Sequence, residues 1–256
     1  MLTPIQRLGF LSLAFVRETG RMFIFLVQTV VSIPRQPWRW HNLLKQIHFM
    51  GMRSMFVIAL TSIFAGMVLA LQGFYTLSRF GSEALLGPAV ALSMIRELGP
   101  VLSGLMITGR AGSAMAAELG IMRIREQIDA LEVMGVPPIH FLAVPRFLAG
   151  LVVLPMLTVI FDVIGIFGGY LVAVQLLGLS AGTYLGGIES AVSMHDISTG
   201  LIKAFCFGIV ITWICSFKGF YARRGAEGVS HATTSAVVLS SVLILVSDYF
   251  ITAIML

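Results

Sequence analysis

The sequence predicts an all-α integral membrane protein with five transmembrane helices and a further N-terminal helix that lies in, or re-enters, the membrane. Hydrophobic residues make up 57% of the 256 residues and charged residues only 11%, whereas soluble domains are about a quarter charged. The mean hydropathy is +0.95. Several uncharged or nearly uncharged runs are long enough to cross a bilayer as helices. A net charge of +5 in such a chain indicates membrane orientation rather than nucleic-acid binding.

The N-terminal segment, residues 1–53, is expected to form an interfacial helical domain. Its apolar stretch Leu8–Val16 runs directly into charged residues without a small-residue cleavage site, so it is expected to stay as an amphipathic helix and not to be a signal peptide. Met22–Val31 is apolar but too short to span a bilayer, and Pro34 and Pro37 then break any helix. This stretch is therefore predicted to be an in-plane or re-entrant element.

Residues 54–256 are predicted to form the transmembrane domain with its five spans. The first span has no charge and would extend roughly 37 Å as a helix, enough to cross a bilayer with some tilt. Asp162 lies inside the third span, and Asp248 lies near the end of the fifth. The five spans are predicted at about 54–78, 85–117, 147–177, 199–217 and 232–254.

The distribution of Lys and Arg predicts the orientation of these spans. Seven lie in residues 1–53, four in 110–146 and three in 218–224, against one in 79–87 and none in 178–198. Lys and Arg concentrate in the cytoplasmic loops of membrane proteins. The N-terminus and the loops after the second and fourth spans are therefore expected in the cytoplasm, and the C-terminus on the other side.

Two adjacent charged residues, Arg96 and Glu97, lie about a third of the way into the second span. Ionisable residues at such depth are costly and usually face a cavity or one another. Two interpretations stay open: an interhelical polar clasp that fixes packing, or a polar contact inside a pocket for an amphipathic substrate. One face of the first span, which could meet lipid or line such a pocket, holds Leu69, Gly73, Thr76, Leu77 and Phe80.

Small residues recur every four positions in the second span, at Gly104, Thr108, Gly112 and Ala116. This spacing lets helix backbones approach closely in lipid. Close packing is the expected role, with sliding between helices as the alternative. Asp162 would lie near mid-membrane, where a hydrogen-bonded structural role is expected rather than a proton relay, because the sequence shows no His or Glu partner for it.

The chain becomes polar between the second and third spans, over residues 118–135, which we call the coupling segment. Acidic and apolar residues alternate there, and Gly135 followed by Pro137 and Pro138 ends the predicted helix. Such a helix suits docking in a groove of another protein. Its acidic character disfavours the alternative of lying on a negative lipid surface. The residues expected to make the contact are Glu118, Arg123, Glu126, Asp129, Glu132, Met134 and Gly135.

The chain resembles the permease subunits of ABC transporters of the MlaE type, which work with MCE proteins. The resemblance covers nearly the whole chain, and the final span begins HATTSAVV (231–238) in the family's manner. The central matching motifs are RELGP (96–100), GRAGSA (109–114), AELG (117–120), EQIDALEVMG (126–135) and PRF (145–147).

This resemblance implies a homodimer in the bacterial inner membrane that moves phospholipids between the inner and outer membranes and helps to maintain outer-membrane lipid asymmetry. It implies that the coupling segment sits in a groove of a cytoplasmic ATPase, that a small STAS-domain protein binds this ATPase, and that a hexameric MCE ring covers the periplasmic face. It also implies a lipid pocket at the dimer interface, formed by Leu69, Thr76, Leu77, Phe80, Arg96 and Glu97.

No G-x-x-x-x-G-K-[ST] motif occurs in the sequence. ATP is therefore expected to be bound and hydrolysed by the partner, and no catalytic residue, cofactor or metal site is predicted in this chain. Two other functions stay open. A proton-driven secondary transporter would use Asp162, Glu97 or Asp248, although no inverted repeat is apparent. A scaffold without transport would explain the coupling segment but not the charged pair in the second span.

Overall fold

The computed structural model describes residues 4–34 and 40–255, with side chains in the first helix described from Ser12 onward except at Phe15. All regular structure within these ranges is helical. Five helical stretches there are long and apolar enough to cross a membrane, which confirms the predicted fold class and number of spans. They are Trp40–Ser78, Glu83–Ile124, Ile139–Leu176, Met194–Phe220 and Ala226–Met255.

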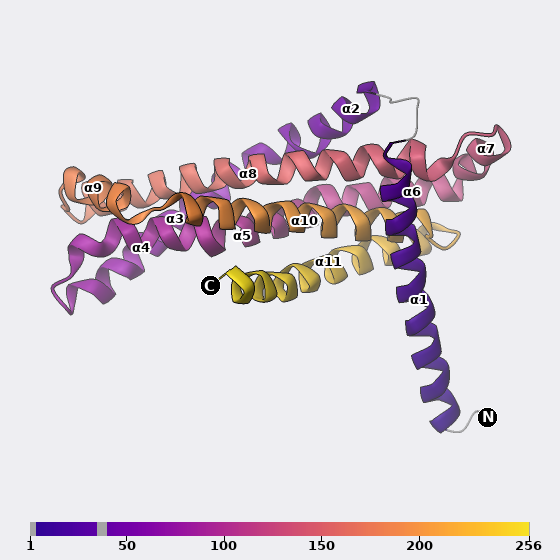
Figure 1. Ribbon diagram of the computed structural model, residues 1–256, viewed down its shortest axis with the longest axis horizontal. Coiled ribbons are helices and arrows are strands. Elements are labelled where there is room, and N and C mark those ends of the chain that lie inside the picture. Colours follow the sequence, from indigo (N-terminus) through magenta and orange to yellow (C-terminus); the bar gives the residue numbers. More distant parts are fainter. Residues whose placement is uncertain (1–3, 35–39, 256) are drawn as a thin grey trace.

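The long helices run side by side as one bundle (Figure 1). In this bundle α3 packs on α8, α8 on α10, and α10 on both α6 and α11. The second and third spans are each assembled from several helical pieces. The first span comprises α2 (Trp40–Met50) and α3 (Met52–Ser78). The second comprises η1 (Glu83–Leu85), α4 (Leu86–Ser93), η2 (Met94–Leu98), α5 (Gly99–Ile107), η3 (Thr108–Gly112) and α6 (Ser113–Ile124). The third comprises η4 (Ile139–Ala143), α8 (Val144–Tyr170) and η5 (Leu171–Leu176), the fourth is α10 (Met194–Phe220), and the fifth is α11 (Ala226–Met255).

Two π-helical turns, η2 and η3, interrupt the second span. A π-turn holds more residues than an α-turn, so the backbone bulges and the side-chain directions shift after it. Such turns are frequent at functional sites. The predicted charged pair, Arg96 and Glu97, lies within η2, so it sits on an irregular turn and not on a regular helical face.

The N-terminal helix α1 (Pro4–Ser32) is continuous over 29 residues and runs across the direction of the long helices (Figure 1). The predicted element Met22–Val31 is thus the C-terminal part of a longer helix. Because α1 does not turn back on itself, it matches the in-plane alternative and not the re-entrant one. The predicted break lies at its end, where Pro34 follows the last helical turn, while Pro37 lies outside the described residues.

The first span begins earlier than its predicted start at Ser54. Only Gly51 separates α3 from α2, and the apolar stretch extends back to Trp40. The expected interfacial segment therefore contains a helix, α2, that packs against α8.

The closest approach between helices joins α3 and α8. A Cβ atom placed on Gly66 would lie 1.8 Å from the carbonyl oxygen of Gly165, and one on Gly168 would lie 2.4 Å from that of Ile63. The hydroxyl of Ser62 also donates to the carbonyl of Phe161. Only glycine leaves room for this contact, which allows the backbones to meet as in other small-residue interfaces in membranes.

The two ends of the bundle carry different elements. Helix α7 (Gln127–Val133) lies at one end, and α9 (Ala181–Ala191) lies at the other, within the predicted external loop (Figure 1). Tyr184 of α9 is fully buried against the bundle. The coupling segment and the predicted external loop are therefore on opposite ends, as an odd number of spans between them requires.

Candidate functional site

Three charged side chains meet inside the bundle where η2, α10 and α11 come together. We call Glu97, Lys203 and Asp248 the charged cluster. Lys203 on α10 is 0% exposed. Its Nζ lies 2.6 Å from Glu97 Oε2 and 3.0 Å from Asp248 Oδ1. It also donates to the carbonyl of Arg96 at 2.9 Å, so the ammonium is held on three sides.

The three side chains of the charged cluster depend on one another, because each compensates the charge of its neighbours. An ammonium without exposed surface would be very costly alone in an apolar bundle. Two carboxylates and one ammonium leave one negative charge in excess. Thr252 on α11 donates weakly to Glu97 Oε1 at 3.4 Å, which gives that carboxylate a neutral partner as well.

The side chain of Arg96 makes a separate ion pair with the beginning of α10. Its Nε donates to Asp196 Oδ1 at 2.6 Å. Asp196 is 1% exposed and forms a capping box with Ser193, whose N and Oγ both donate to Oδ2 at 2.8 Å. The adjacent Arg96 and Glu97 therefore do not pair with each other, because neighbouring residues on a helix point about 100° apart.

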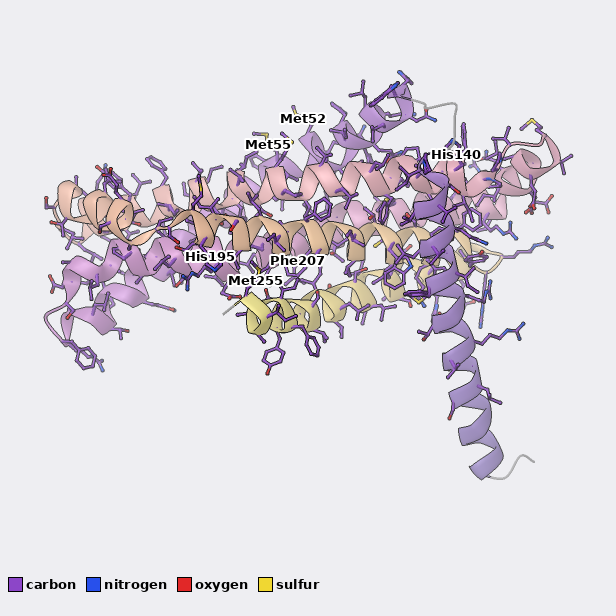
Figure 2. All side chains as sticks on the ribbon, in the orientation of Figure 1. Met52, Met55, His140, His195, Phe207 and Met255 are labelled. Atoms are coloured by element: carbon purple, nitrogen blue, oxygen red, sulfur yellow. The ribbon has the colours of Figure 1, made fainter. Side chains whose placement is uncertain are left out.

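A cavity of about 240 Å³ opens beside the charged cluster. Its lining mixes a cation, a carboxylate, an imidazole and an apolar side chain. Figure 2 shows His195 at the start of α10 and Met255 at the end of α11, near the same part of the bundle. The volume is below the roughly 300–1,000 Å³ of a drug-sized ligand site, so the space suits only a small polar group. The lining residues are Arg96, Glu97, His195, Thr199, Thr252 and Met255.

A family model described as Permease MlaE matches residues 43–254, which include the whole charged cluster. The chain belongs to the MlaE permease family.

Three known proteins are similar to the chain over most of its length. A probable ABC transporter permease protein from Rickettsia bellii is 42% identical over 252 residues, 98% of this chain and 97% of that protein. The intermembrane phospholipid transport system permease protein MlaE from Haemophilus influenzae is also 42% identical over 252 residues, with the same coverage. The chloroplastic protein TRIGALACTOSYLDIACYLGLYCEROL 1 from Arabidopsis thaliana is 36% identical over 226 residues, 88% of this chain and 65% of that protein.

The lipid-pocket residues predicted from the likeness to MlaE-type permeases do not all meet within one protomer. Arg96 and Glu97 line the cavity, but none of the four predicted residues of the first span does. Phe80 is 77% exposed and Thr76 is also exposed. Leu69 and Leu77 of α3 are partly buried against the core. A shared pocket at a dimer interface therefore stays a prediction.

Sequence reasoning missed Lys203, which is the centre of the charged cluster. The signal was present, since this residue is the only Lys or Arg within the predicted fourth span. A lysine in an apolar span needs a carboxylate partner, and Glu97 and Asp248 were the acids nearest to the same membrane depth. Asp196 was also missed, because it was counted as a loop charge and not as the capping residue of α10.

Asp162 does not belong to the charged cluster. Its carboxylate packs on the backbone of the second span, where a Cβ atom on Gly99 would lie 1.8 Å from Oδ1. This oxygen is buried and has no hydrogen-bond partner within the described ranges. The expectation of a hydrogen-bonded structural aspartate is thus not met at Oδ1, although no cationic partner appears there either.

The four predicted packing residues of the second span, Gly104, Thr108, Gly112 and Ala116, are buried. A Cβ atom on Gly104 would contact Phe207 of α10 and Ile244 of α11, each at 3.5 Å, and one on Gly112 would lie 2.9 Å from Cys215 Sγ. The stripe therefore faces α10 and α11.

The coupling segment differs from the single helix that the sequence predicted. Helix α6 carries the second span through to Ile124, and the shorter α7 begins at Gln127. Between them Glu126 adopts a left-handed conformation with φ of +56°, and Gly135 at φ of +73° follows α7. A left-handed residue cannot continue a right-handed helix, so the segment is broken at Glu126.

Most charges of the coupling segment are paired within the chain. The ion pairs are Glu118–Arg146 at 3.2 Å, Arg123–Asp129 at 2.5 Å and Glu126–Arg224 at 3.6 Å.

The apolar side of the coupling segment is also partly used within the chain. Ile128 is buried among side chains of α6, η4 and α10. The exposed tip of the segment is formed by Glu132, Val133 and Met134, with Val133 89% exposed. Arg125, Glu126, Gln127 and Ala130 are exposed as well, so the tip is the apolar part of a larger surface that is available to another protein.

Proposed function

We propose that this chain is the membrane-spanning permease subunit of an ATP-driven ABC transporter that moves phospholipids between the inner and outer membranes. The observation that carries the proposal is the charged cluster, which places polar groups and a headgroup-sized cavity inside an apolar bundle. An amphipathic ligand needs both environments. Membership of the MlaE permease family and the printed function of the Haemophilus influenzae relative support the same conclusion.

The proposed complex is a homodimer in a bacterial inner membrane, with its N-terminus in the cytoplasm and its C-terminus in the periplasm. A cytoplasmic ABC ATPase, which binds a small STAS-domain protein, would contact the exposed tip of the coupling segment. A hexameric MCE protein would sit at the end that carries α9. The Lys and Arg bias of the loops supports this orientation, and the missing P-loop supports a separate ATPase. The activity would maintain lipid asymmetry of the outer membrane.

A second protomer would complete the lipid pocket. The cavity beside Arg96 is too small for acyl chains, while Thr76 near the end of α3 and Phe80 in the turn after it are exposed. We propose that the pocket joins the polar cavity to these exposed residues across the dimer interface, together with Leu69 and Leu77. Motion of the ATPase would then change the pocket through the helices that pack on the coupling segment.

Proton-driven transport is the alternative that the carboxylates could support. Glu97 and Asp248 are both held by Lys203, which favours a fixed ionic structure over proton exchange. Transport that persists in Asp162→Asn and Asp248→Asn variants would exclude this alternative. Loss of transport in Asp162→Asn alone, with ATPase activity unchanged, would support it.

Substitution of Arg96 by glutamine tests the proposed lipid pocket. We expect the variant to fold with a lower melting temperature, because the buried Asp196 loses its cationic partner but keeps its capping bonds to Ser193, so lipid occupancy is measured on the folded fraction. Hydrogen bonds to charged groups contribute about 1.5–3 kcal/mol, so lipid occupancy should fall by about tenfold or more. The measurements are phospholipid extracted from the purified complex and ATP-dependent lipid transfer between vesicles. Arg79→Gln, at an exposed site outside the cavity, is the matched control; equal lipid occupancy in both variants would contradict the assignment.

Charge reversal at the tip of the coupling segment tests the ATPase contact. Glu132→Arg should weaken copurification of the ATPase and lower its lipid-stimulated hydrolysis, because this exposed acid has no ion-pair partner among the described residues. The membrane domain should melt at an unchanged temperature. Glu189→Arg at the opposite end of the bundle is the control for ATPase copurification and hydrolysis; it is not a control for lipid transport, because the MCE protein is proposed to sit at that end. If Glu132→Arg transports lipid at the normal rate, the tip is not the coupling contact.

A further inference from the structure

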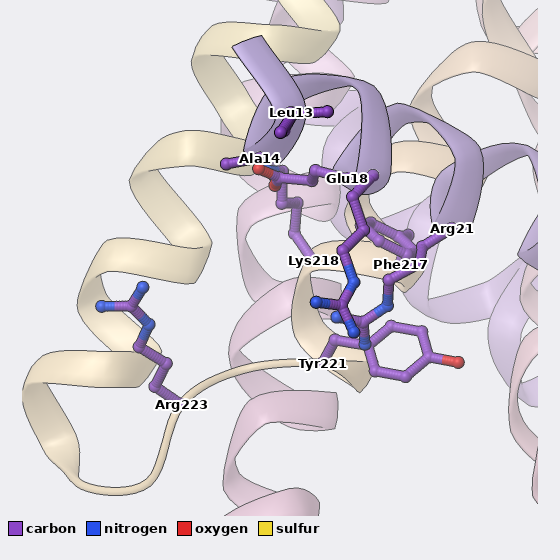
Figure 3. A pocket seen from close by; sticks show the side chains of 9 residues that line it. Leu13, Ala14, Glu18, Arg21, Phe217, Lys218, Tyr221 and Arg223 are labelled. Carbon is purple, nitrogen blue, oxygen red and sulfur yellow. The ribbon is translucent and has the colours of Figure 1, made fainter. Parts of the chain in front are cut away.

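A second hollow lies where α1 crosses the end of α10, remote from the charged cluster. It has a volume of about 690 Å³, and Figure 3 shows its side chains arranged around the open space. Its lining contains four cations, Arg17, Arg21, Lys218 and Arg223, and one carboxylate, Glu18. We call this hollow the basic groove. Its position on α10 is roughly 22 Å from Lys203 along the helix axis.

The cations of the basic groove are mostly uncompensated. Glu18 pairs with Lys218, which uses the one carboxylate of the lining. The guanidinium of Arg21 lies over the ring of Tyr221, with Cζ 4.5 Å from the ring centroid. In the part of the chain that the structure describes, no carboxylate pairs with Arg17, Arg21 or Arg223. Guanidinium groups bind phosphate oxygens in a bidentate manner, so this lining favours a phosphate group.

The cations of the basic groove lie next to exposed apolar side chains, an arrangement that suits a lipid headgroup and its acyl chains. Helix α1 buries Met22, Phe25 and Thr29 against the bundle. Its opposite face is apolar yet exposed, and by helical spacing Arg17 and Arg21 lie on the flank between these two faces. Phe217 and Leu13 extend the groove with apolar surface. The exposed apolar stripe of α1 comprises Leu13, Val16, Phe23, Ile24, Val27, Val30 and Val31.

The direction of α1 places the exposed apolar stripe at the depth of the acyl chains of the bilayer. The long helices cross the membrane, and α1 runs across them at the end of the bundle that also carries α7 (Figure 1). An amphipathic helix in this position lies in the membrane interface with its apolar face in the acyl region. Its flanking arginines are then at the level of the phosphates. Basic pockets beside transmembrane helices bind anionic headgroups in this way.

We propose that the basic groove binds the phosphate of an anionic phospholipid from the surrounding leaflet, with its acyl chains along the apolar stripe of α1. A zwitterionic lipid would bring its own ammonium toward three uncompensated guanidiniums and is disfavoured. This lipid holds α1 against the bundle and is distinct from the cargo near Arg96. The proposal does not depend on the proposed transport function.

The test uses the purified full chain in mixed micelles that contain either phosphatidylglycerol or phosphatidylcholine. Native mass spectrometry counts bound lipid, and a lipid titration of the melting temperature gives the apparent affinity. The groove variant carries Arg17→Gln, Arg21→Gln and Arg223→Gln together. The matched control removes three exposed arginines elsewhere, through Arg53→Gln, Arg79→Gln and Arg125→Gln.

The wild-type chain and the control should bind phosphatidylglycerol more tightly than phosphatidylcholine. The groove variant should lose on the order of 100-fold in affinity for phosphatidylglycerol, given the usual contribution of each basic residue near a lipid surface. Unchanged affinity in the groove variant, or equal binding of both lipids by the wild type, would overturn the proposal. Displacement of the lipid by excess inorganic phosphate would make the groove a free-phosphate site instead. Loss of a copurified protein with lipid affinity unchanged would assign it to an acidic protein surface.

Discussion

Substitution of Lys203 by methionine is expected to destabilise the protein by about 1–3 kcal/mol, because it breaks two ion pairs whose carboxylates, Glu97 and Asp248, remain partly exposed. The ammonium has no exposed surface and lies 2.6 Å from Glu97 and 3.0 Å from Asp248. Methionine fills a similar volume, so little of the loss should come from packing. The measurement is the melting temperature of the detergent-purified chain, with the yield of folded protein as a second readout.

A variant in which all three residues of the charged cluster are neutral tests separately whether the charges are needed for stability and whether they are needed for transport. In the triple variant Lys203→Met, Glu97→Gln, Asp248→Asn, much of the lost stability should return, because replacing a whole buried ionic set is often close to neutral. Lipid transport should be reduced, since the cavity loses the charge of Glu97 and the cluster beside it loses all of its charges. A Lys203→Met variant that melts like the wild type would show that the cluster is not structural. Normal transport in the triple variant would show that its charges are not needed for lipid.

Substitution of Gly66 by alanine should produce the largest effect of any single methyl group added to the bundle. The new Cβ would lie 1.8 Å from the carbonyl oxygen of Gly165, so α3 and α8 must separate. Overpacking in a core costs about 1–3 kcal/mol and sometimes more, and a backbone contact this close belongs at the upper end. Because α8 also packs on α10, the shift should reach the charged cluster, and a reduced melting temperature should accompany reduced lipid occupancy.

Gly186→Ala in α9 is the matched control for Gly66→Ala. A Cβ atom at Gly186 meets nothing within 4 Å, and alanine favours the helix by up to about 1 kcal/mol over glycine. The control should therefore melt at the same or a higher temperature. If both variants melt alike, the α3–α8 contact has more room than its geometry indicates.

The spans could be predicted because lipid imposes a simple pattern on sequence. Long apolar runs must be helices, since no water is available to satisfy the backbone, and all five were found. The length of α1 was harder to predict from the sequence. Hydropathy divided Pro4–Ser32 into an amphipathic part and an apolar part, although the structure has one helix. From Met22 onward the helix buries Met22, Phe25 and Thr29 against the bundle, whereas Glu18 and Arg21 contact the end of α10 through charged side chains, so the composition changes while the backbone stays helical.

The candidate site was only half predictable. Arg96 and Glu97 were found because charge is rare in a span, and the same rule would have found Lys203. The rule cannot identify the partner of each charge, because the pairing depends on how α10 and α11 are oriented about their axes. The left-handed turn at Glu126 had no signal at all, because glycine or asparagine normally marks such a turn and neither is present.

Helix α10 links the end of the bundle near the coupling segment to the charged cluster. Its unbroken length carries Phe217, which belongs to the same buried cluster as Ile128 of the coupling segment, near one end and Lys203 roughly 21 Å away toward the other. Because the chain turns at Glu126, α7 does not continue the axis of α6, and α10 is the continuous helix between the two regions. We therefore expect a displacement of α10 near Phe217 to reach the ammonium that contacts Glu97 and Asp248.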